Sequence, residues 1–223
     1  MPAPVRRAVA AVGLVLALAG PAASQSPREF KGAAPGTFDF YVLALSWSPG
    51  FCDLEGREKG REQCETGRRL GFTVHGLWPQ YENGYPAECG TPRSPSRAAL
   101  EEAEGVFPDL GLARYEWRKH GTCSGESPAG YFRDARRARD RVRIPDRFAD
   151  LDRAEEAAPI EIERAFAAAN PGLRPDMMAV ACRRGILQEV RICLDRNLAG
   201  FRRCPEIDRS GCRFGELRLG AAP

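Results

Sequence analysis

The chain has only two histidines, and each lies in a short string of residues able to do chemistry. His75 stands in Phe-Thr-Val-His-Gly-Leu-Trp-Pro, residues 72–79, and His120 stands in Tyr-Glu-Trp-Arg-Lys-His-Gly-Thr-Cys, residues 115–123. Imidazole is the side chain whose unperturbed pKa lets it donate and accept protons near neutral pH. Two imidazoles in one site can therefore serve as the base and the acid of a single reaction.

Two charged residues accompany the second histidine at helical spacing. Glu116, Lys119 and His120 fall at positions i, i+3 and i+4, so a helix presents all three on one face. Such a set suits RNA cleavage by the neighbouring 2′-hydroxyl, in which one group removes the 2′ proton, another protonates the leaving 5′-oxygen, and a cation stabilises the phosphoryl charge. Glu116 could orient an imidazole, hold Lys119 or hydrogen-bond a phosphoryl oxygen.

Each of these residues also has a purely structural interpretation. An isolated histidine beside Gly76 is more often packed or at the surface, and Glu116 with Lys119 would ordinarily be an exposed helix pair worth roughly a few tenths of a kcal/mol. Trp78 and Trp117 would ordinarily belong to the core. The functional interpretation is favoured because both histidines fall at predicted element ends and one is flanked by a lysine and a glutamate.

The first 24 residues have the order of a secretory signal peptide. Arg6 and Arg7 precede an apolar run from Ala8 to Ala19, and small residues follow for cleavage near Ala23. The alternative is a membrane anchor, but the run has about a dozen residues and a spanning helix needs roughly 20. We therefore expect secretion or a periplasmic location, no membrane attachment after cleavage, and a single domain over residues 25–223.

The overall charge of the mature chain is too small to attract nucleic acid by itself. Removing the signal takes away Arg6 and Arg7 and no acid, so the formal charge falls from +3 to about +1. Binding of a polyanion must then come from a local site. Residues 133–143 are crowded with arginine and aspartate and could form an RNA-binding stripe, but an exposed helix face with ion pairs is the favoured interpretation.

All eight cysteines lie beyond the predicted signal. An even number in an exported chain indicates four disulfides, and the sequence alone leaves their pairing open. Structural zinc is not favoured, because there is no Cys-x-x-Cys and the two histidines lie in separate strings.

The pattern of apolar residues predicts an α+β fold, an antiparallel β-sheet packed against several helices and stapled by disulfides. A central strand is expected at 37–47 and a second at 70–75, where Gly76 ends the strand and Pro79 prevents its continuation. A hairpin is expected from 177–182 and 186–193, and a last strand around 212–219.

Local capping signals predict the helices. They are expected at 94–104 after Ser94 as the N-cap, at 112–120 with Gly121 as the C-terminal cap, from Ser127-Pro128 onward, and at 159–169. Residues 26–36 are expected to be a mobile arm and residues 50–69 a disulfide-stapled loop.

The two histidine strings closely resemble the two active-site boxes of the ribonuclease T2 family, whose members are exported, disulfide-bonded, metal-independent endoribonucleases. The boxes are long, and their order and separation fit, whereas the resemblance is loose over the rest of the mature chain. It implies catalytic roles for His75, Glu116 and His120, with Lys119 stabilising the phosphoryl transition state. It also implies that His120 acts first as base and His75 as acid, and that they exchange roles to hydrolyse a 2′,3′-cyclic phosphate to a 3′-phosphate.

The resemblance also points to substrate-binding residues. Trp78 matches a family tryptophan that stacks on a base, a contact typically worth about 1–3 kcal/mol, and Gln80 and Tyr85 are weaker candidates for the same pocket. Tyr115 stands where many members have a phosphate-binding histidine, and here the chain is similar to bacterial members. A phenol donates one hydrogen bond but cannot become cationic, so we expect weaker or less pH-sensitive phosphate binding there, and not loss of catalysis.

The family pattern further implies the disulfides Cys89–Cys123 and Cys182–Cys212, the latter nested around Cys193–Cys204, which leaves Cys52 with Cys64. The expected protein is a monomer that cleaves single-stranded RNA without a metal or other cofactor. One alternative is a catalytically silent, exported RNA-binding or interaction module of the same fold, which would be expected to have lost a box histidine. The other is a metal-dependent nuclease or phosphatase, for which the sequence offers no evident carboxylate cluster.

Overall fold

The computed structural model describes residue 1 and residues 28–91, 94–149 and 152–221. Apart from Met1, the predicted signal peptide and its cleavage site lie outside the described residues. Within these ranges, none of the helices combines the length and the apolar character needed to cross a membrane.

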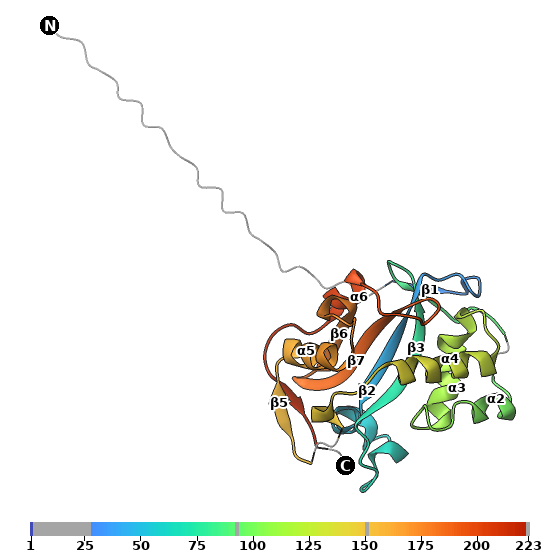
Figure 1. The fold of residues 1–223 in the computed structure, drawn as a ribbon, viewed down its shortest axis with the longest axis horizontal. Helices are drawn as coiled ribbons and strands as arrows, with labels where there is room; N and C mark the ends of the chain where they lie inside the picture. The colour runs from blue at the N-terminus through green and yellow to red at the C-terminus, as the bar shows by residue number, and fades with distance from the viewer. Residues whose placement is uncertain (2–27, 92–93, 150–151, 222–223) are drawn as a thin grey trace.

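A six-stranded sheet forms the centre of the fold (Figure 1). Its order is β3-β2-β7-β8-β5, and β6 pairs with β7. The pairings are antiparallel except for one parallel contact between β7 and β8, so the sheet is mixed and not purely antiparallel as predicted. The parallel contact arises because β8 returns to the sheet through helix α6 and a loop, a long connection that does not impose the antiparallel direction of a tight turn. The strands are β2 Phe40–Trp47, β3 Phe72–Gln80, β5 Glu155–Ala157, β6 Met178–Arg183, β7 Ile186–Asp195 and β8 Leu217–Leu219.

Strand β2 lies between β3 and β7 and is covered on both faces because almost all of its residues are apolar. Tyr41, Leu43 and Leu45 point into the main core, whereas Phe40 and Val42 belong to a smaller cluster on the opposite face. This alternation assigns the even-numbered side chains of β2 to one face of the sheet.

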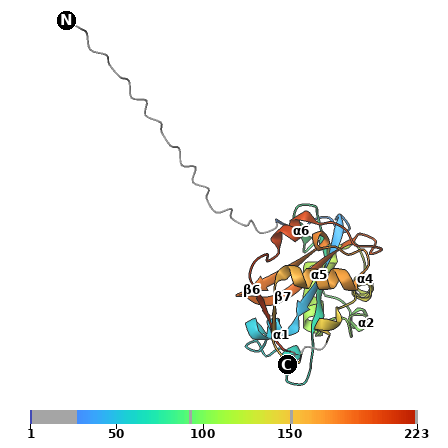
Figure 2. The ribbon, with the colours of Figure 1, turned by 60° about the vertical axis from the view of Figure 1, so that its left-hand side comes forward.

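The helices of the main core pack on the other face (Figures 1 and 2). Helices α3 and α4 pack against the edge strand β3, and α5 packs against β6. Helix α6 supplies Ile207 to the smaller cluster on the opposite face. The helices are α1 Ser48–Phe51, α2 Arg97–Glu101, α3 Leu110–Lys119, α4 Pro128–Arg141, α5 Pro159–Ala169 and α6 Pro205–Ser210.

The prediction that the second strand stops at Gly76 was wrong, because β3 continues through Gly76 and Pro79 to Gln80. Strand β3 lies at the edge of the sheet, where one side of the strand has no partner and a proline removes no essential hydrogen bond. The register also slips along the strand, since Gly76 pairs with Ala44 but Val74 pairs with Leu45. His75 is therefore the unpaired residue of a β-bulge.

The predicted start of α4 and both ends of α5 are confirmed. Helix α2 begins after Ser96 and not after Ser94, because the Ser96 hydroxyl accepts the N–H of Ala99. Helix α3 begins earlier than predicted because the Asp109 carboxylate accepts the N–H of Leu112.

Gly121 does not act as the predicted C-terminal cap of α3. The helix ends at His120, whose N–H donates to the Glu116 carbonyl at 2.9 Å, and a 3-10 turn, Gly121–Cys123, follows directly. A β-carbon at Gly121 would collide with the Trp117 and Tyr131 rings. The glycine is required for close packing against those rings and not for a left-handed conformation.

The predicted hairpin of β6 and β7 is confirmed. Its turn residues Arg184 and Gly185 have φ of 54° and 72°, the conformation of a tight turn that matches the twist of the strands. The last strand, β8, is shorter than predicted.

The predicted mobile arm instead carries a strand from Glu29 onward. Strand β1, Glu29–Lys31, pairs in parallel with β4, Tyr85–Ala87. Backbone N–H groups of Gly32 and Tyr85 extend this pairing at both ends, to the carbonyls of Ala87 and Arg28. Hydrogen bonds to β4 satisfy backbone groups of this segment and hold it in place.

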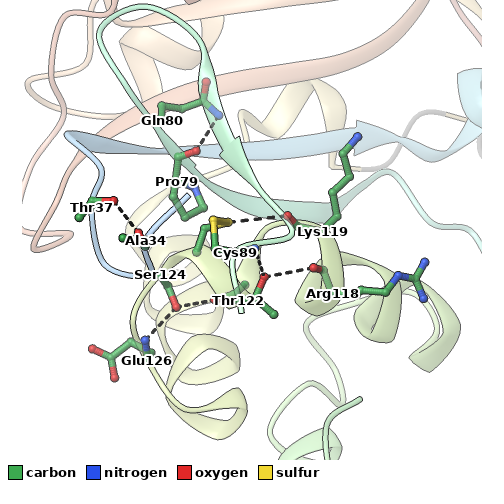
Figure 3. The surroundings of a disulfide bond; sticks show 12 residues. Ala34, Thr37, Pro79, Gln80, Cys89, Arg118, Lys119, Thr122, Ser124 and Glu126 are labelled. Carbon is green, nitrogen blue, oxygen red and sulfur yellow. Dashed lines mark hydrogen bonds between the residues drawn. A yellow bond between two sulfur atoms is a disulfide. The ribbon is translucent and has the colours of Figure 1, made fainter. Parts of the chain in front are cut away.

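Four disulfides connect the described elements: Cys52–Cys64, Cys89–Cys123, Cys182–Cys212 and Cys193–Cys204. They are the pairs that the family resemblance implies. Cys89–Cys123 joins the segment after β4 to the turn after α3 (Figure 3). The Cys89 N–H also donates to the Thr122 hydroxyl, so covalent and hydrogen bonds together hold the end of α3.

The arginine-rich part of α4 forms the predicted ion pairs. Arg133 pairs with Glu102, Arg137 with Asp134, and the following Arg143 with Asp146. Arg136 and Arg139 of the same segment donate to backbone carbonyls, so carboxylates balance only part of its positive charge.

Candidate active site

A cavity of about 300 Å³ brings together all eight candidate catalytic and substrate-binding residues. Strand β3, helix α3 and strand β4 contribute these side chains, and strand β7 and helix α6 complete the wall. A second cavity of about 520 Å³ adjoins it and shares His75 and Tyr115. The residues lining the first cavity are His75, Trp78, Gln80, Tyr85, Tyr115, Glu116, Lys119, His120, Arg191 and Ile207.

The β-bulge in β3 presents His75 to two carboxylates. Its Nδ1 lies 2.7 Å from Oε2 of Glu189, and its Nε2 lies 3.6 Å from Oε1 of Glu116. Burial lowers the pKa of His75, but the hydrogen bond and charge of Glu189 and the charge of Glu116 outweigh this effect and raise the pKa to about 9. His75 is therefore protonated at neutral pH.

Glu189 and Arg191 on β7 were not among the predicted site residues. The Arg191 Nε donates to Oε1 of Glu189 at 2.6 Å, while Oε2 of the same carboxylate faces His75. Although burial raises the pKa of Glu189, Arg191 and His75 lower it to about 2. The sequence signal was a glutamate in an apolar-rich run predicted to be a hairpin strand, since a carboxylate that such a strand buries requires a partner.

Helix α3 presents Glu116 and His120 to the cavity, while Ala113 and Trp117 on its other side enter the main core. Glu116 is buried, and its Oε2 accepts the indole N–H of Trp78 at 2.7 Å. Burial raises the pKa of Glu116 to about 7, against the opposing effects of the His75 charge and the Trp78 hydrogen bond. The carboxyl group thus titrates near neutral pH.

The ring of Trp78 packs against both imidazoles. Its centroid is 5.3 Å from His75, edge to face, and 5.3 Å from His120, with the planes tilted by 30°. The Arg191 guanidinium lies over the same ring at 5.4 Å. Trp78 is therefore a packing partner of both His75 and His120, as well as a lining residue of the cavity.

His120 differs from His75 in its surroundings. It is buried, and its Nδ1 has no hydrogen-bond partner among the described residues. Burial lowers the pKa of His120 well below its ordinary value, and the charges of Lys119 and His75 lower it further. His120 is therefore neutral at neutral pH.

Lys119 lies in the last turn of α3, beside the tyrosines of the cavity wall. Burial opposes its charge, but Tyr115, Tyr85 and Glu29 outweigh that effect and raise the pKa of Lys119, so it remains cationic. Its side chain extends away from the Cys89–Cys123 disulfide (Figure 3).

The weaker base-pocket candidates also line the cavity. Gln80 is buried and donates from Nε2 to the Pro79 carbonyl at 3.0 Å, which leaves its amide oxygen directed elsewhere (Figure 3). The Tyr85 hydroxyl donates to Glu29 at 3.1 Å, and the Tyr85 ring lies 6.0 Å from His120. Among the described residues, no group of three or more histidines, cysteines or acids has the arrangement of a metal site.

The family model described as "Ribonuclease T2 family" matches residues 38–204. The chain belongs to the ribonuclease T2 family. This ribonuclease T2 chain is 38% identical to "Ribonuclease" of Aeromonas hydrophila over 173 residues, covering 77% of this chain and 78% of that one. It is 27% identical to "Ribonuclease DdI" of Dictyostelium discoideum over 224 residues, covering 92% and 95%.

Solved structures show the same fold. RNase NT, in a complex with 5′-AMP, matches with a TM-score of 0.64 and 23% identity, over 83% of this chain and 98% of that chain. At this identity the likeness establishes the fold alone. The ribonuclease T2 fold thus holds both histidine strings of this chain on one cavity.

The glycine after His75 has a physical reason in this ribonuclease T2 site. A β-carbon at Gly76 would collide with Oε2 of Glu116 and with the Trp78 indole nitrogen. Only glycine therefore allows the Trp78–Glu116 hydrogen bond to form directly over strand β3.

We expect Gly76→Ala to break the Trp78–Glu116 hydrogen bond and to lower the free energy of unfolding by about 1–3 kcal/mol, because an extra methyl group forces a packed site apart. Urea unfolding followed by circular dichroism measures this loss. Gly200→Ala is the matched control, since its β-carbon would meet only the Asp195 carboxylate, at 3.3 Å. Equal stability of the two variants would contradict the packing role of Gly76.

Proposed function

We propose that this protein is an exported endoribonuclease that cleaves single-stranded RNA by attack of the 2′-hydroxyl on the neighbouring phosphorus. The products are a 2′,3′-cyclic phosphate and a free 5′-hydroxyl, and water then opens the cyclic phosphate to a 3′-phosphate. The observation that carries the proposal is one cavity lined by both histidines, Lys119 and Glu116, in which two carboxylates face His75 and none of the described residues hydrogen-bonds Nδ1 of His120. Membership of the ribonuclease T2 family supports it.

The opposite pKa shifts assign the proton transfers. Neutral His120 takes the 2′ proton, and because its Nδ1 is buried, its Nε2 is the nitrogen that serves as base. The 2′-oxygen forms its bond to phosphorus as the bond to the 5′-oxygen breaks, and protonated His75 gives its proton to that leaving oxygen. In the second step His75 removes a proton from water and His120 protonates the 2′-oxygen. Each acid or base contributes typically about 10²–10⁴-fold.

Lys119 and Glu116 act on the phosphoryl oxygens. Lys119 supplies the cation that stabilises the charge developing in the transition state. Glu116, with a pKa of about 7, is protonated in part at neutral pH and can donate a hydrogen bond to a phosphoryl oxygen. Oε1 of Glu116 lies 3.6 Å from Nε2 of His75, which supports the binding of both groups to one phosphate.

Substrate binding is assigned to the remaining residues of the cavity wall. Trp78 offers an aromatic face to a base, with Gln80 and Tyr85 as polar neighbours, and such stacking is typically worth about 1–3 kcal/mol. Tyr115, whose side chain is exposed, donates a hydrogen bond to a phosphate oxygen in place of a cationic histidine.

Export, a single domain and a monomeric state belong to the same proposal. Four disulfides support an oxidising compartment, the periplasm or the outside of the cell, and the signal-like residues 1–24 supply the route. The alternative of a catalytically silent module is not favoured, because both histidines, Lys119 and Glu116 are present on one cavity.

We expect the protein to cut single-stranded RNA in EDTA and to leave 2′-O-methyl RNA and DNA intact, because the attacking group is the 2′-hydroxyl. Electrophoresis of defined oligonucleotides tests this, with mass spectrometry of the cyclic-phosphate end. Cleavage of 2′-O-methyl RNA would exclude the mechanism. Digestion of defined dinucleotides in the same assay identifies the favoured base.

His75→Ala and His120→Ala should each lower kcat/KM by about 10²–10⁴-fold because each removes one proton transfer, and both variants should still fold, since Arg191 continues to pair with Glu189 in His75→Ala. Initial rates on a dinucleotide and thermal unfolding measure the two effects. If folding is lost together with activity, the histidines are packing residues and the assignment is wrong.

The pH dependence of kcat/KM should be bell-shaped. Activity falls on the acid side at a pH well below the ordinary histidine pKa, where His120 becomes protonated and can no longer accept a proton, and on the alkaline side near pH 9, where His75 loses the proton that it donates. Initial rates from pH 4 to 10 measure both limbs. An alkaline limb near the ordinary histidine pKa would contradict the assigned roles.

A further inference from the structure

We propose that Glu189, a buried carboxylate on β7, is a positioning residue that determines which of the two imidazoles carries the proton. It holds His75 protonated and fixes its ring so that Nε2 faces the leaving oxygen. This inference rests on the proposed function, because it gives a structural cause for the roles of acid and base.

The register of the sheet brings Glu189 to His75 across the central strand. On β2, Ser46 pairs with Glu189 on one side and with Thr73 on the other, and Ala44 pairs with Arg191 and with Gly76. Ala44 and Ser46 are small, in contrast to Phe40 and Val42 at the start of β2 on the same face. Longer side chains from β7 and β3 can therefore meet over Ala44 and Ser46, and the bulge at His75 aims its ring toward them.

Two carboxylates face His75, and only one of them keeps its charge throughout the working pH range. Glu116, on α3, lies 3.6 Å from Nε2 and has a pKa of about 7. Glu189 hydrogen-bonds Nδ1 at 2.7 Å and has a pKa of about 2. Arg191, the other charge that acts on the pKa of His75, is cationic and opposes an imidazolium, and neither Glu55 nor Asp109 of the adjoining cavity contributes to that pKa. Glu189 is thus the constant partner of the proton on His75.

Arg191 completes the arrangement by fixing Glu189. Its Nε donates to Oε1 of the carboxylate at 2.6 Å, which leaves Oε2 free to accept from His75. A buried carboxylate without such partners would take up a proton and lose its effect. The cation lowers the pKa of His75 slightly, but it keeps Glu189 ionised and oriented.

His120 shows the opposite case. The charges that act on it are those of Lys119 and His75, both positive, and no hydrogen-bond partner of its Nδ1 is found among the described residues. Two histidines of one cavity therefore differ in protonation because one has a carboxylate on Nδ1 and the other does not. Strand β7, which carries Glu189, thus sets the protonation of His75 without itself taking part in the proton transfers.

The direct test is an NMR titration of the two histidine Cε1–H signals in the whole protein. The chain has only two histidines, so His75→Ala assigns both signals. In Glu189→Gln, the pKa of His75 should fall by about 1–3 pH units, because a neutral amide replaces the charge and cannot accept from both His75 and Arg191. Asp195→Asn is the control, because it removes a charge from the same strand. The pKa values of both histidines in this variant should match those of the wild type.

The kinetic test separates positioning from general damage. In Glu189→Gln, the alkaline limb of kcat/KM should move to lower pH by the same amount as the NMR pKa, with a loss at pH 8 of about twofold for a fall of one unit and about ninetyfold for three, and a loss of at most about twofold at pH 6. Glu189→Asp keeps the charge on a shorter side chain, so its alkaline limb should lie between that of the wild type and that of Glu189→Gln. A structural role would lower the rate equally at every pH.

An unchanged pKa of His75 in Glu189→Gln, or an equal loss at all pH values, would overturn the inference. The titration does not depend on activity. A wild-type protein that leaves RNA intact but shows the shift would therefore overturn the proposed function and leave the role of Glu189 in place. If Glu189→Gln does not fold, Glu189→Asp alone still tests the inference, because its His75 pKa should lie below that of the wild type.

Discussion

The site depends on a hydrogen bond between the His75 imidazole, which lines the cavity, and the buried Glu189 carboxylate. A buried carboxylate is stable only when it is paired, and here Arg191 and His75 share one carboxylate between them. The position of every neighbouring group follows from this contact. Glu116 faces the other ring nitrogen, Trp78 donates to Glu116, and His120 packs against Trp78.

The scaffold meets these requirements with small residues at the points of close approach. Gly76 lets Glu116 and Trp78 lie over β3, and Gly121 lets the end of α3 pack on Trp117 and Tyr131. The Cys89–Cys123 disulfide then fixes the end of α3, from which Lys119 and His120 project, to the segment that follows β4. Precision at the two histidines therefore comes from backbone packing around them and from a covalent bond close to one of them.

Local sequence rules identified most elements, and their failures have physical causes. Caps and hairpin signals gave α4, α5 and the β6–β7 turn because those features depend on neighbouring residues only. The end of β3 was misplaced at Gly76 because a proline is excluded from a central strand but tolerated at an edge, and edge position is a property of the whole sheet. The pairing of β1 with β4 was missed for a similar reason, since its partner lies far along the chain.

The sequence by itself determined the chemical groups: two imidazoles, an ammonium and a carboxylate in two strings, together with enough cysteines for four disulfides. The family resemblance added their expected roles. Only the tertiary structure decided which imidazole is protonated, because that depends on Glu189 and Arg191, more than a hundred residues from His75 along the chain and adjacent to it across β2. Protonation is set by the charges within a few ångströms of a group, and sequence order does not specify those distances.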